Sequence, residues 1–192
     1  MKRMLVFGGA RSGKSGFSER IAQQWSVEGT QYKEVIYIAT ASVSTDPEMQ
    51  ERIAHHQSQR PKHWLTIEEK FALGDAIVKY SRPETVLLID CLTVWLSNCI
   101  FADATVFPEV GPITPPAMFT QQRLALLDAL THAQGKVILV SNEVGMGIVP
   151  MGAISRWFVD EAGRLNQATA AICEHVVWVA AGLPLYLKGQ SC

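Results

Sequence analysis

Short apolar runs of strand length recur along the chain and alternate with stretches of helical periodicity. The runs begin near residues 4, 35, 85, 136, 175 and 184. Continuous apolar runs are typical of parallel strands that are covered on both faces. The alternation therefore predicts an α/β fold with a mostly parallel sheet and helices on both of its faces. The last run follows a turn at Gly182 and is a candidate for an antiparallel edge strand.

The segments between these runs predict helices. Phe17, Ile21 and Trp25 recur at spacings of four and mark one face of a helix that fades near Gly29. Residues 71–80 and 154–172 are also helical in pattern, and 63–68 form a short extended stretch. A further helix, ending by Gly135, would place Leu124, Leu127 and Leu130 on its inner stripe.

One more helix begins at Asp46 and Pro47, which suit the N-cap and the first helical position. It would run to about Gln59 and stop before Pro61. It carries His55 and His56, and helical geometry puts His56 on the apolar face while His55 points more toward water.

Residues Gly8 to Ser15 read Gly-Gly-Ala-Arg-Ser-Gly-Lys-Ser and fit the phosphate-binding pattern G-x-x-x-x-G-K-[ST]. An apolar strand leads into the loop and a helix leads out. Glycines let backbone N–H groups curl around a polyphosphate, and the helix directs its positive end at the same anion. Lys14 would reach the β- and γ-phosphates, and the Ser15 hydroxyl would bind Mg2+. The alternative, a glycine-rich turn without a ligand, does not explain this strand and helix context.

The run Thr85 to Asp90 ends in an acidic residue, as a Walker B strand does. Asp90 would then lie near the Mg2+ of the nucleotide. The alternative is that Asp90 caps the helix that begins around Leu92.

Length and composition describe one soluble globular domain over residues 1–192, with a proline-rich surface loop at 102–116. The net charge of -1 provides no field for a nucleic-acid backbone. The apolar stretches are too short to cross a membrane, and the first strand begins too early for a signal peptide. The cysteines lack close pairing, so we expect reduced thiols in the cytoplasm, with Cys91 and Cys173 as small core residues.

His56 narrows the choice among phosphate-transfer reactions. A histidine on an apolar helical face is usually a packed core residue. Here Arg60, Lys62 and His63 lie close in sequence, beside the predicted nucleotide site. A neutral imidazole can attack phosphorus and pass the group on. Zinc ligation is disfavoured, because adjacent histidines point apart on a helix.

The order of motifs along the chain resembles a known family. The motifs are Gly-Gly-Ala-Arg-Ser-Gly-Lys-Ser at 8–15, Tyr-Ile-Ala-Thr at 37–40, Arg-Ile-Ala-His-His at 52–56, Arg-Pro and His-Trp between 60 and 64, Asp-Cys-Leu-Thr at 90–93, Ser-Asn-Glu-Val-Gly-Met-Gly-Ile-Val-Pro at 141–150, Asp160, Gly-Arg at 163–164 and Asn-Gln at 166–167. Together they resemble the bifunctional adenosylcobinamide kinase / adenosylcobinamide-phosphate guanylyltransferases of cobalamin synthesis.

The resemblance implies a RecA-like P-loop NTPase fold and two reactions. ATP or GTP phosphorylates adenosylcobinamide, a corrinoid, and GTP then guanylylates a histidine that passes GMP to adenosylcobinamide phosphate, giving adenosylcobinamide-GDP. The family's modified histidine maps to His56, and its members are homotrimers. The implied nucleotide contacts are Gly8, Gly9, Ala10, Arg11, Ser12, Gly13, Lys14, Ser15, Thr40, Ala41, Ser42, Gln57, Ser58, Gln59, Arg60, Glu68 and Asp90. The residues themselves also leave open a plain small-molecule kinase, in which His56 is structural, and a RecA-like NTPase module.

Overall fold

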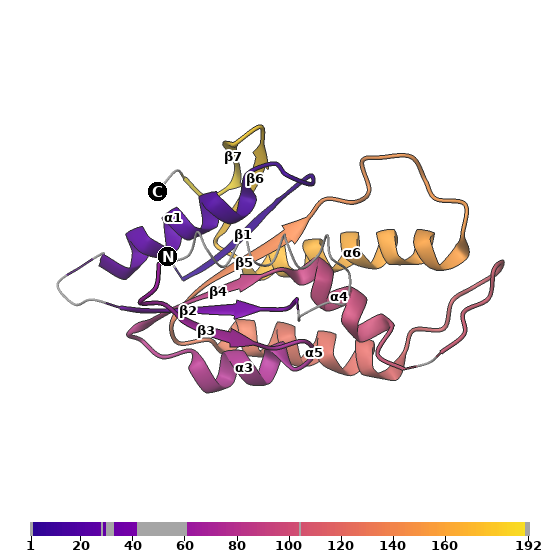
Figure 1. Ribbon diagram of the computed structural model, residues 1–192, viewed down its shortest axis with the longest axis horizontal. Helices are drawn as coiled ribbons and strands as arrows, with labels where there is room; N and C mark the ends of the chain where they lie inside the picture. The colour runs from indigo at the N-terminus through magenta and orange to yellow at the C-terminus, as the bar shows by residue number, and fades with distance from the viewer. Residues whose placement is uncertain (1, 28, 30–32, 42–60, 104, 191–192) are drawn as a thin grey trace.

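The computed structural model describes residues 2–27, 29, 33–41, 61–103 and 105–190, and these residues contain one seven-stranded sheet (Figure 1). Its order is β3-β2-β4-β5-β1-β6-β7. The strands are β1 (Arg3–Gly8), β2 (Glu34–Ala39), β3 (Leu65–Glu68), β4 (Thr85–Asp90), β5 (Lys136–Asn142), β6 (His175–Ala180) and β7 (Leu183–Lys188). The strands that the apolar runs predicted are all present.

Every neighbouring pair in this sheet is parallel except β6 and β7. The prediction of a mostly parallel sheet with an antiparallel edge strand is therefore confirmed. The sequence indicated only an extended stretch around β3, whereas the structure pairs Leu65 with Ile36 of β2 and makes β3 the other edge strand. The hydrophobic pattern of β3 is weak because three of its four residues are exposed.

The described helices are α1 (Lys14–Val27), α3 (Leu73–Tyr80), α4 (Leu92–Ile100), α5 (Ala117–His132) and α6 (Ala153–Ile172). The helix predicted from Asp46 to about Gln59, which carries His55 and His56, lies outside the described residues.

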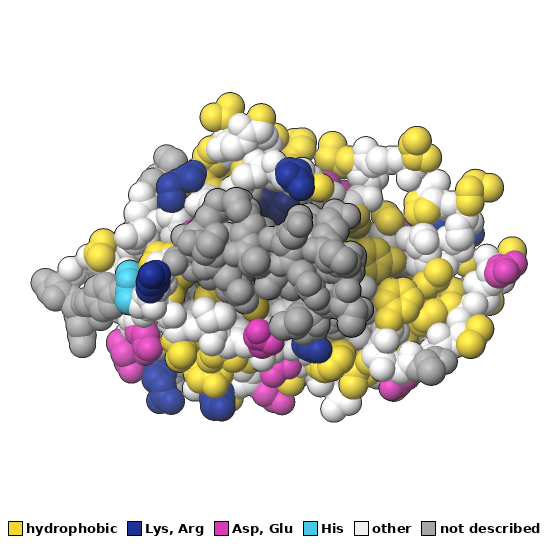
Figure 2. Space-filling model, viewed as in Figure 1, with side chains coloured by type: hydrophobic (Ala, Val, Ile, Leu, Met, Phe, Trp, Pro, Cys, Tyr) yellow, Lys and Arg dark blue, Asp and Glu magenta, His cyan; other side chains and the backbone are white. Residues whose placement is uncertain are grey.

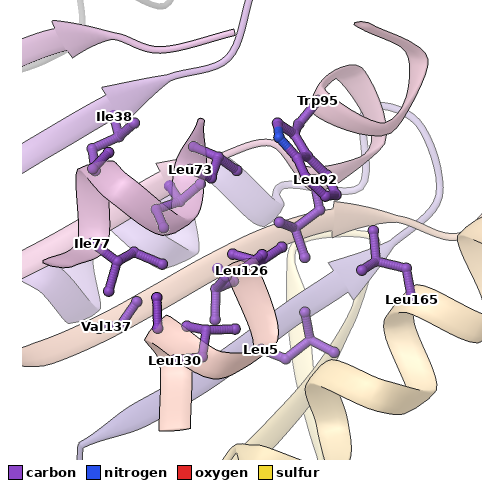
Figure 3. Packing of buried hydrophobic residues seen from close by; sticks show 14 of the residues in the cluster. Leu5, Ile38, Leu73, Ile77, Leu92, Trp95, Leu126, Leu130, Val137 and Leu165 are labelled. Carbon is purple, nitrogen blue, oxygen red and sulfur yellow. The ribbon is translucent and has the colours of Figure 1, made fainter. Parts of the chain in front are cut away.

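Alternate residues of the five inner strands, β1, β2, β4, β5 and β6, enter two separate cores. Met4 and Val6 of β1 pack with Phe17, Ile21 and Trp25 of α1 on one face of the sheet. Leu5 faces the opposite side, where residues of the other inner strands pack with α3, α4, α5 and α6 in a larger core (Figure 3). The period-2 alternation of strand side chains produces this division, and helices on both faces are confirmed.

The predicted inner stripe of α5 is partly wrong. Leu124 is 61% exposed and Leu127 is half-buried. The buried positions of this helix are Phe119, Leu126, Ala129 and Leu130. Leucines recur at several spacings in this segment, so periodicity alone did not fix which of them faces the sheet.

Cys91, Cys99 and Cys173 are free and buried, which confirms Cys91 and Cys173 as small core residues. Cys192 lies outside the described residues. No helix in the described part of the chain has the length and apolar character to cross a membrane.

Candidate nucleotide-binding site

The loop from Gly8 to Ser15 joins β1 to α1 at the carboxyl edge of the sheet, where open α/β sheets bind ligands. The Ser12 N–H donates to the Gly9 carbonyl at 3.3 Å, and the Phe17 N–H donates to the Gly13 carbonyl at 3.0 Å. Arg11 has a φ of 54° and Gly13 one of 95°. The loop thus folds back before α1 begins at Lys14, which places the N-terminus of this helix beside the loop.

Close backbone approaches explain two of the loop's glycines. A Cβ added at Gly8 would lie 2.2 Å from the Val179 carbonyl oxygen. A Cβ at Gly13 would lie 3.1 Å from the Cα of Gly182. The Gly182 N–H also donates to the Ser12 carbonyl at 2.8 Å, so the turn between β6 and β7 supports the phosphate loop from behind.

That turn was missed as part of the site. Ala181 and Gly182 have φ values of 51° and 78°, as a two-residue hairpin turn of type I′ requires. The sequence indicated a turn at Gly182, but only the sheet order β1-β6-β7 brings it to the loop.

Lys14 is buried, and its Nζ donates to the Gly9 carbonyl at 2.6 Å. Burial lowers the pKa of Lys14 below its usual 10.5, while the negative charges of Cys91, when ionised, and of Asp90 oppose that shift. The side chain thus lies across the loop and within electrostatic reach of the β4 end. The Ser12 hydroxyl is buried and has no hydrogen-bond partner among the described residues.

Asp90 ends β4 next to these groups, and its Oδ2 accepts a hydrogen bond from the Tyr37 hydroxyl at 3.0 Å. The N-cap of α4 is Cys91, so Asp90 does not take the capping position that was its alternative role. Burial raises the pKa of the Cys91 thiol to about 12, and the Asp90 charge adds to this effect. Cys91 therefore stays protonated at neutral pH and is no nucleophile.

Thr40 holds the end of β2 to the end of β4. Its hydroxyl donates to the Cys91 carbonyl and accepts from the Cys91 N–H, both at 2.8 Å, and the side chain is fully buried. The Thr40 N–H donates to the Asp90 carbonyl at 3.1 Å. The Thr40 hydroxyl proton is thus already donated to a backbone carbonyl. Through its bonds to Cys91 and Asp90, Thr40 positions Asp90.

The remaining predicted contacts fall in three groups. Gly9, Ala10 and Arg11 are exposed at the tip of the loop, and Ser15 is half-buried in the first turn of α1. Ala41 is half-buried after β2, and Glu68 is exposed at the end of β3, paired in register with Ala39. Ser42, His56, Gln57, Ser58, Gln59 and Arg60 lie outside the described residues.

Ser15 and Asp90 supply a hydroxyl and a carboxylate, which are oxygen ligands of the kind that Mg2+ prefers. Among the described residues, no group of three or more histidine, cysteine or acidic side chains is arranged to hold a metal ion. These two residues therefore fit a cation that also binds phosphate oxygens, as Mg2+ does in P-loop proteins.

A cavity of about 630 Å³ opens beside the loop. It is lined by Gly9, Ala10, Arg11, Ser12, Glu143, Val144, Met146, Gly147, Trp178, Val179, Ala180 and Ala181. Phosphate-loop residues form one wall, and the segment after β5 and the end of β6 form the others. The loop after β5 is thus part of the same site.

Sequence comparison gives consistent relatives over the whole chain. Residues 4–187 match the family described as Cobinamide kinase / cobinamide phosphate guanyltransferase (CobU). Over 188 residues the chain is 45% identical to the bifunctional adenosylcobalamin biosynthesis protein CobP of Pseudomonas aeruginosa, covering 98% of each. It is 37% identical to the bifunctional adenosylcobalamin biosynthesis protein CobU of Escherichia coli K12, covering 96% of this chain and 99% of that protein.

Solved structures confirm the RecA-like P-loop fold. A prototypical ATPase from the type III secretion system of pathogenic bacteria superposes with a TM-score of 0.57 at 14% identity over 96% of this chain. The assembled ATPase EscN of enteropathogenic E. coli gives 0.54, also at 14% identity, over 94% of this chain. The chain spans only 56% and 43% of these ATPases, and at this identity the likeness concerns the fold alone.

Proposed function

The chain belongs to the cobinamide kinase / cobinamide phosphate guanyltransferase family and has both activities, and from this premise we propose that one phosphate loop serves both transfers. The observation that carries the proposal is the loop itself. Its backbone is bent around the start of α1, and the buried Lys14 lies within electrostatic reach of Asp90. Family membership does not favour the plain kinase or the NTPase module.

In the kinase reaction, the loop and Lys14 bind the β- and γ-phosphates of ATP or GTP while the γ-phosphoryl group moves to the hydroxyl of adenosylcobinamide. Lys14 stabilises the charge that develops on the transferred and leaving oxygens. Ser15 and Asp90 would hold Mg2+, which neutralises phosphate charge when bound.

In the guanylyltransferase reaction, the same loop binds GTP so that its α-phosphate faces His56. The imidazole attacks phosphorus and pyrophosphate leaves, which gives a guanylylated histidine. The phosphate of adenosylcobinamide phosphate then takes the GMP and gives adenosylcobinamide-GDP. The nucleotide contacts predicted from the sequence, from Gly8 to Asp90, belong to this proposal.

We also propose that the chain is cytoplasmic, where nucleotides and reduced thiols are available, and that it forms a homotrimer. Hydrophobic side chains gather at one end of the molecule, on the 102–116 loop and the loop before α6 (Figure 2). Val106, Val110, Ile148 and Met151 are each more than four-fifths exposed. Sedimentation equilibrium should give the mass of three chains, and Ile148→Asp should lower it.

The test of the function is covalent labelling with GTP that carries its label in the α-phosphate. The wild-type protein should retain acid-labile GMP, and mass spectrometry should place it on His56. His56→Ala should lose the label and still transfer the γ-phosphate. His132→Ala, at an exposed histidine on α5, is the matched control and should label normally. Equal labelling of His56→Ala and wild type would show that another residue is the nucleophile.

Lys14→Ala tests the shared loop. Both transfers should fall at least about 100-fold, because the same cation stabilises the phosphate charge in each. Lys79→Ala removes an exposed lysine of α3 and is the control. If Lys14→Ala impaired one transfer and left the other at wild-type rate, the two reactions would not share this loop.

A further inference from the structure

Among the described residues that line the cavity beside the phosphate loop, Glu143 is the one acidic residue and Arg11 is the one basic residue. Family resemblance assigns Glu143 no role, although it lies within the motif Ser-Asn-Glu-Val-Gly-Met-Gly. A carboxylate next to a polyphosphate site repels the nucleotide, so its position calls for a different partner.

The structure fixes Glu143 to the phosphate loop through the main chain. Asn142 pairs with Gly8 in the parallel ladder of β5 and β1. The Glu143 N–H donates to the Gly8 carbonyl at 2.9 Å. The side chain therefore starts one residue beyond the sheet, beside the first residue of the loop.

The carboxylate is held in turn by the segment that follows it. Its Oε1 accepts a hydrogen bond from the Gly145 N–H at 2.6 Å. A Cβ at Gly145 would lie 3.2 Å from that oxygen, closer than side chains normally pack, so glycine suits this position. Holding one oxygen limits the directions that the other oxygen can take.

Side chains of α4 and α6 also hold the end of β5. The Thr93 hydroxyl of α4 accepts from the Asn142 N–H at 2.8 Å, and the Asn166 amide of α6 donates to the Asn142 carbonyl at 3.4 Å. Glu143 thus projects from a strand end that three elements hold in place, and such support gives a catalytic group a defined position.

The rest of the cavity suits an acceptor larger than a nucleotide phosphate. Val144, Met146, Trp178 and Val179 are apolar residues that line it together with the loop residues. A substrate with a broad apolar body and one alcohol could pack its body there and direct the alcohol toward the phosphates.

We propose that Glu143 is a catalytic residue of the kinase reaction, where it orients the acceptor hydroxyl and takes its proton. This inference rests on the proposed function. The hydroxyl oxygen bonds to the γ-phosphorus as the bond from that phosphorus to the β–γ bridging oxygen breaks. The bridging oxygen leaves on the nucleoside diphosphate, and the hydroxyl proton passes to the carboxylate.

The two activities need this carboxylate to different degrees, and that difference makes the inference testable. An alcohol carries a proton that must be removed during phosphoryl transfer. In guanylyl transfer the first nucleophile is a neutral imidazole, and the second is a phosphate that is already ionised at neutral pH. Neither of those nucleophiles needs Glu143 as a base.

The experiment compares Glu143→Gln and Glu143→Asp with wild type in two separate assays. One follows γ-labelled ATP or GTP with adenosylcobinamide, and the other follows α-labelled GTP with adenosylcobinamide phosphate supplied directly. Gln keeps an oxygen for the Gly145 N–H but cannot take the proton. We expect Glu143→Gln to lower kinase kcat about 100-fold, Glu143→Asp to recover part of it, and guanylyl transfer to change by no more than about twofold.

Glu109→Gln, at an exposed glutamate in the 102–116 loop, is the control and should leave both rates at the wild-type value. An equal loss in both assays, with or without a lower melting temperature, would show that Glu143 is structural and overturn the inference. An unchanged kinase rate in Glu143→Gln would overturn it too. Absence of γ-transfer or of the GMP adduct in wild type would instead refute the proposed function.

Discussion

The phosphate loop lies at the carboxyl edge of the sheet, and so does the junction where Thr40, after β2, meets Asp90 and Cys91 at the end of β4, here called the Asp90 junction; the two are held in different ways. Main-chain contacts shape the loop: a side chain at Gly8 would collide with Val179, and one at Gly13 would press tightly against Gly182. Side chains shape the junction: the Thr40 hydroxyl, just after β2, pairs with both backbone groups of Cys91, and the Tyr37 hydroxyl donates to Asp90. The loop should therefore be sensitive to added atoms, and the junction to lost polar groups.

The largest effect is expected for Gly8→Val. Its Cβ would lie 2.2 Å from the Val179 carbonyl oxygen, so the loop or β6 must shift. We expect a loss of about 3 kcal/mol in the free energy of unfolding, measured by urea denaturation, and the loss of both transfers.

Gly9→Val is the matched stability control, because a Cβ at Gly9 meets no atom within 4 Å. It should change the free energy of unfolding by less than about 0.5 kcal/mol. If both valine variants were equally stable, close approach would not be what shapes this loop.

Thr40→Val should have the next largest effect. Valine keeps the shape but leaves the buried N–H and carbonyl of Cys91 without the partners they have in the wild type. We expect a loss of about 2 kcal/mol in the free energy of unfolding. Thr40→Ser, which restores the hydroxyl, should recover most of this loss. Equal losses in both variants would trace the effect to packing and remove the contrast with the loop.

Gly182→Val tests whether the β6–β7 turn supports the loop during catalysis. Gly182 has a φ of 78°, so valine should cost about 1.5 kcal/mol through backbone strain. Because its N–H holds the Ser12 carbonyl, the KM for the nucleoside triphosphate should also rise in both transfers.

Two further variants separate strain from support at this turn. Gly182→Asn tolerates a positive φ and keeps the N–H, so it should restore the KM. Gly111→Val carries a similar strain at a φ of 107° in the exposed 102–116 loop, and it should lower stability without changing KM. A raised KM in Gly111→Val would mean that KM follows stability alone.

The same contrast explains what the sequence could predict. The strands and the glycines of the phosphate loop were readable because local requirements select them: apolar runs for covered strands, and glycine where no side chain fits. Asp90 was readable as the end of such a run. The role of Thr40 was not, because its partner Cys91 is 51 positions away and reaches it only through the pairing of β2 with β4.

Two other features depended on the folded sheet in the same way. Nothing local indicates that the turn at Ala181 and Gly182 contacts the loop; the order β1-β6-β7 determines it. Glu143 could be placed on the ligand edge from the sequence, but its contact with Gly8 needed the register of β5 against β1. Of the leucines predicted as the inner stripe of α5, Leu130 is buried and Leu124 is not, since which side of a helix is inner depends on what packs against it.

The smallest expected effect concerns Lys14, the side chain that spans the loop and the junction. Burial lowers its pKa below 10.5, so the folded state binds its proton less well than the unfolded chain does. Keeping Lys14 protonated therefore costs folding free energy at neutral pH. That cost disappears as the pH rises toward 10.5, so the free energy of unfolding of the wild type should rise over that range relative to Lys14→Met. Urea denaturation of both proteins at pH 7 and pH 10 measures the change, and Lys79→Met, at an exposed position, supplies the baseline to subtract. A stability difference that stayed constant, or that moved toward Lys14→Met, would show that burial does not oppose the charge on Lys14.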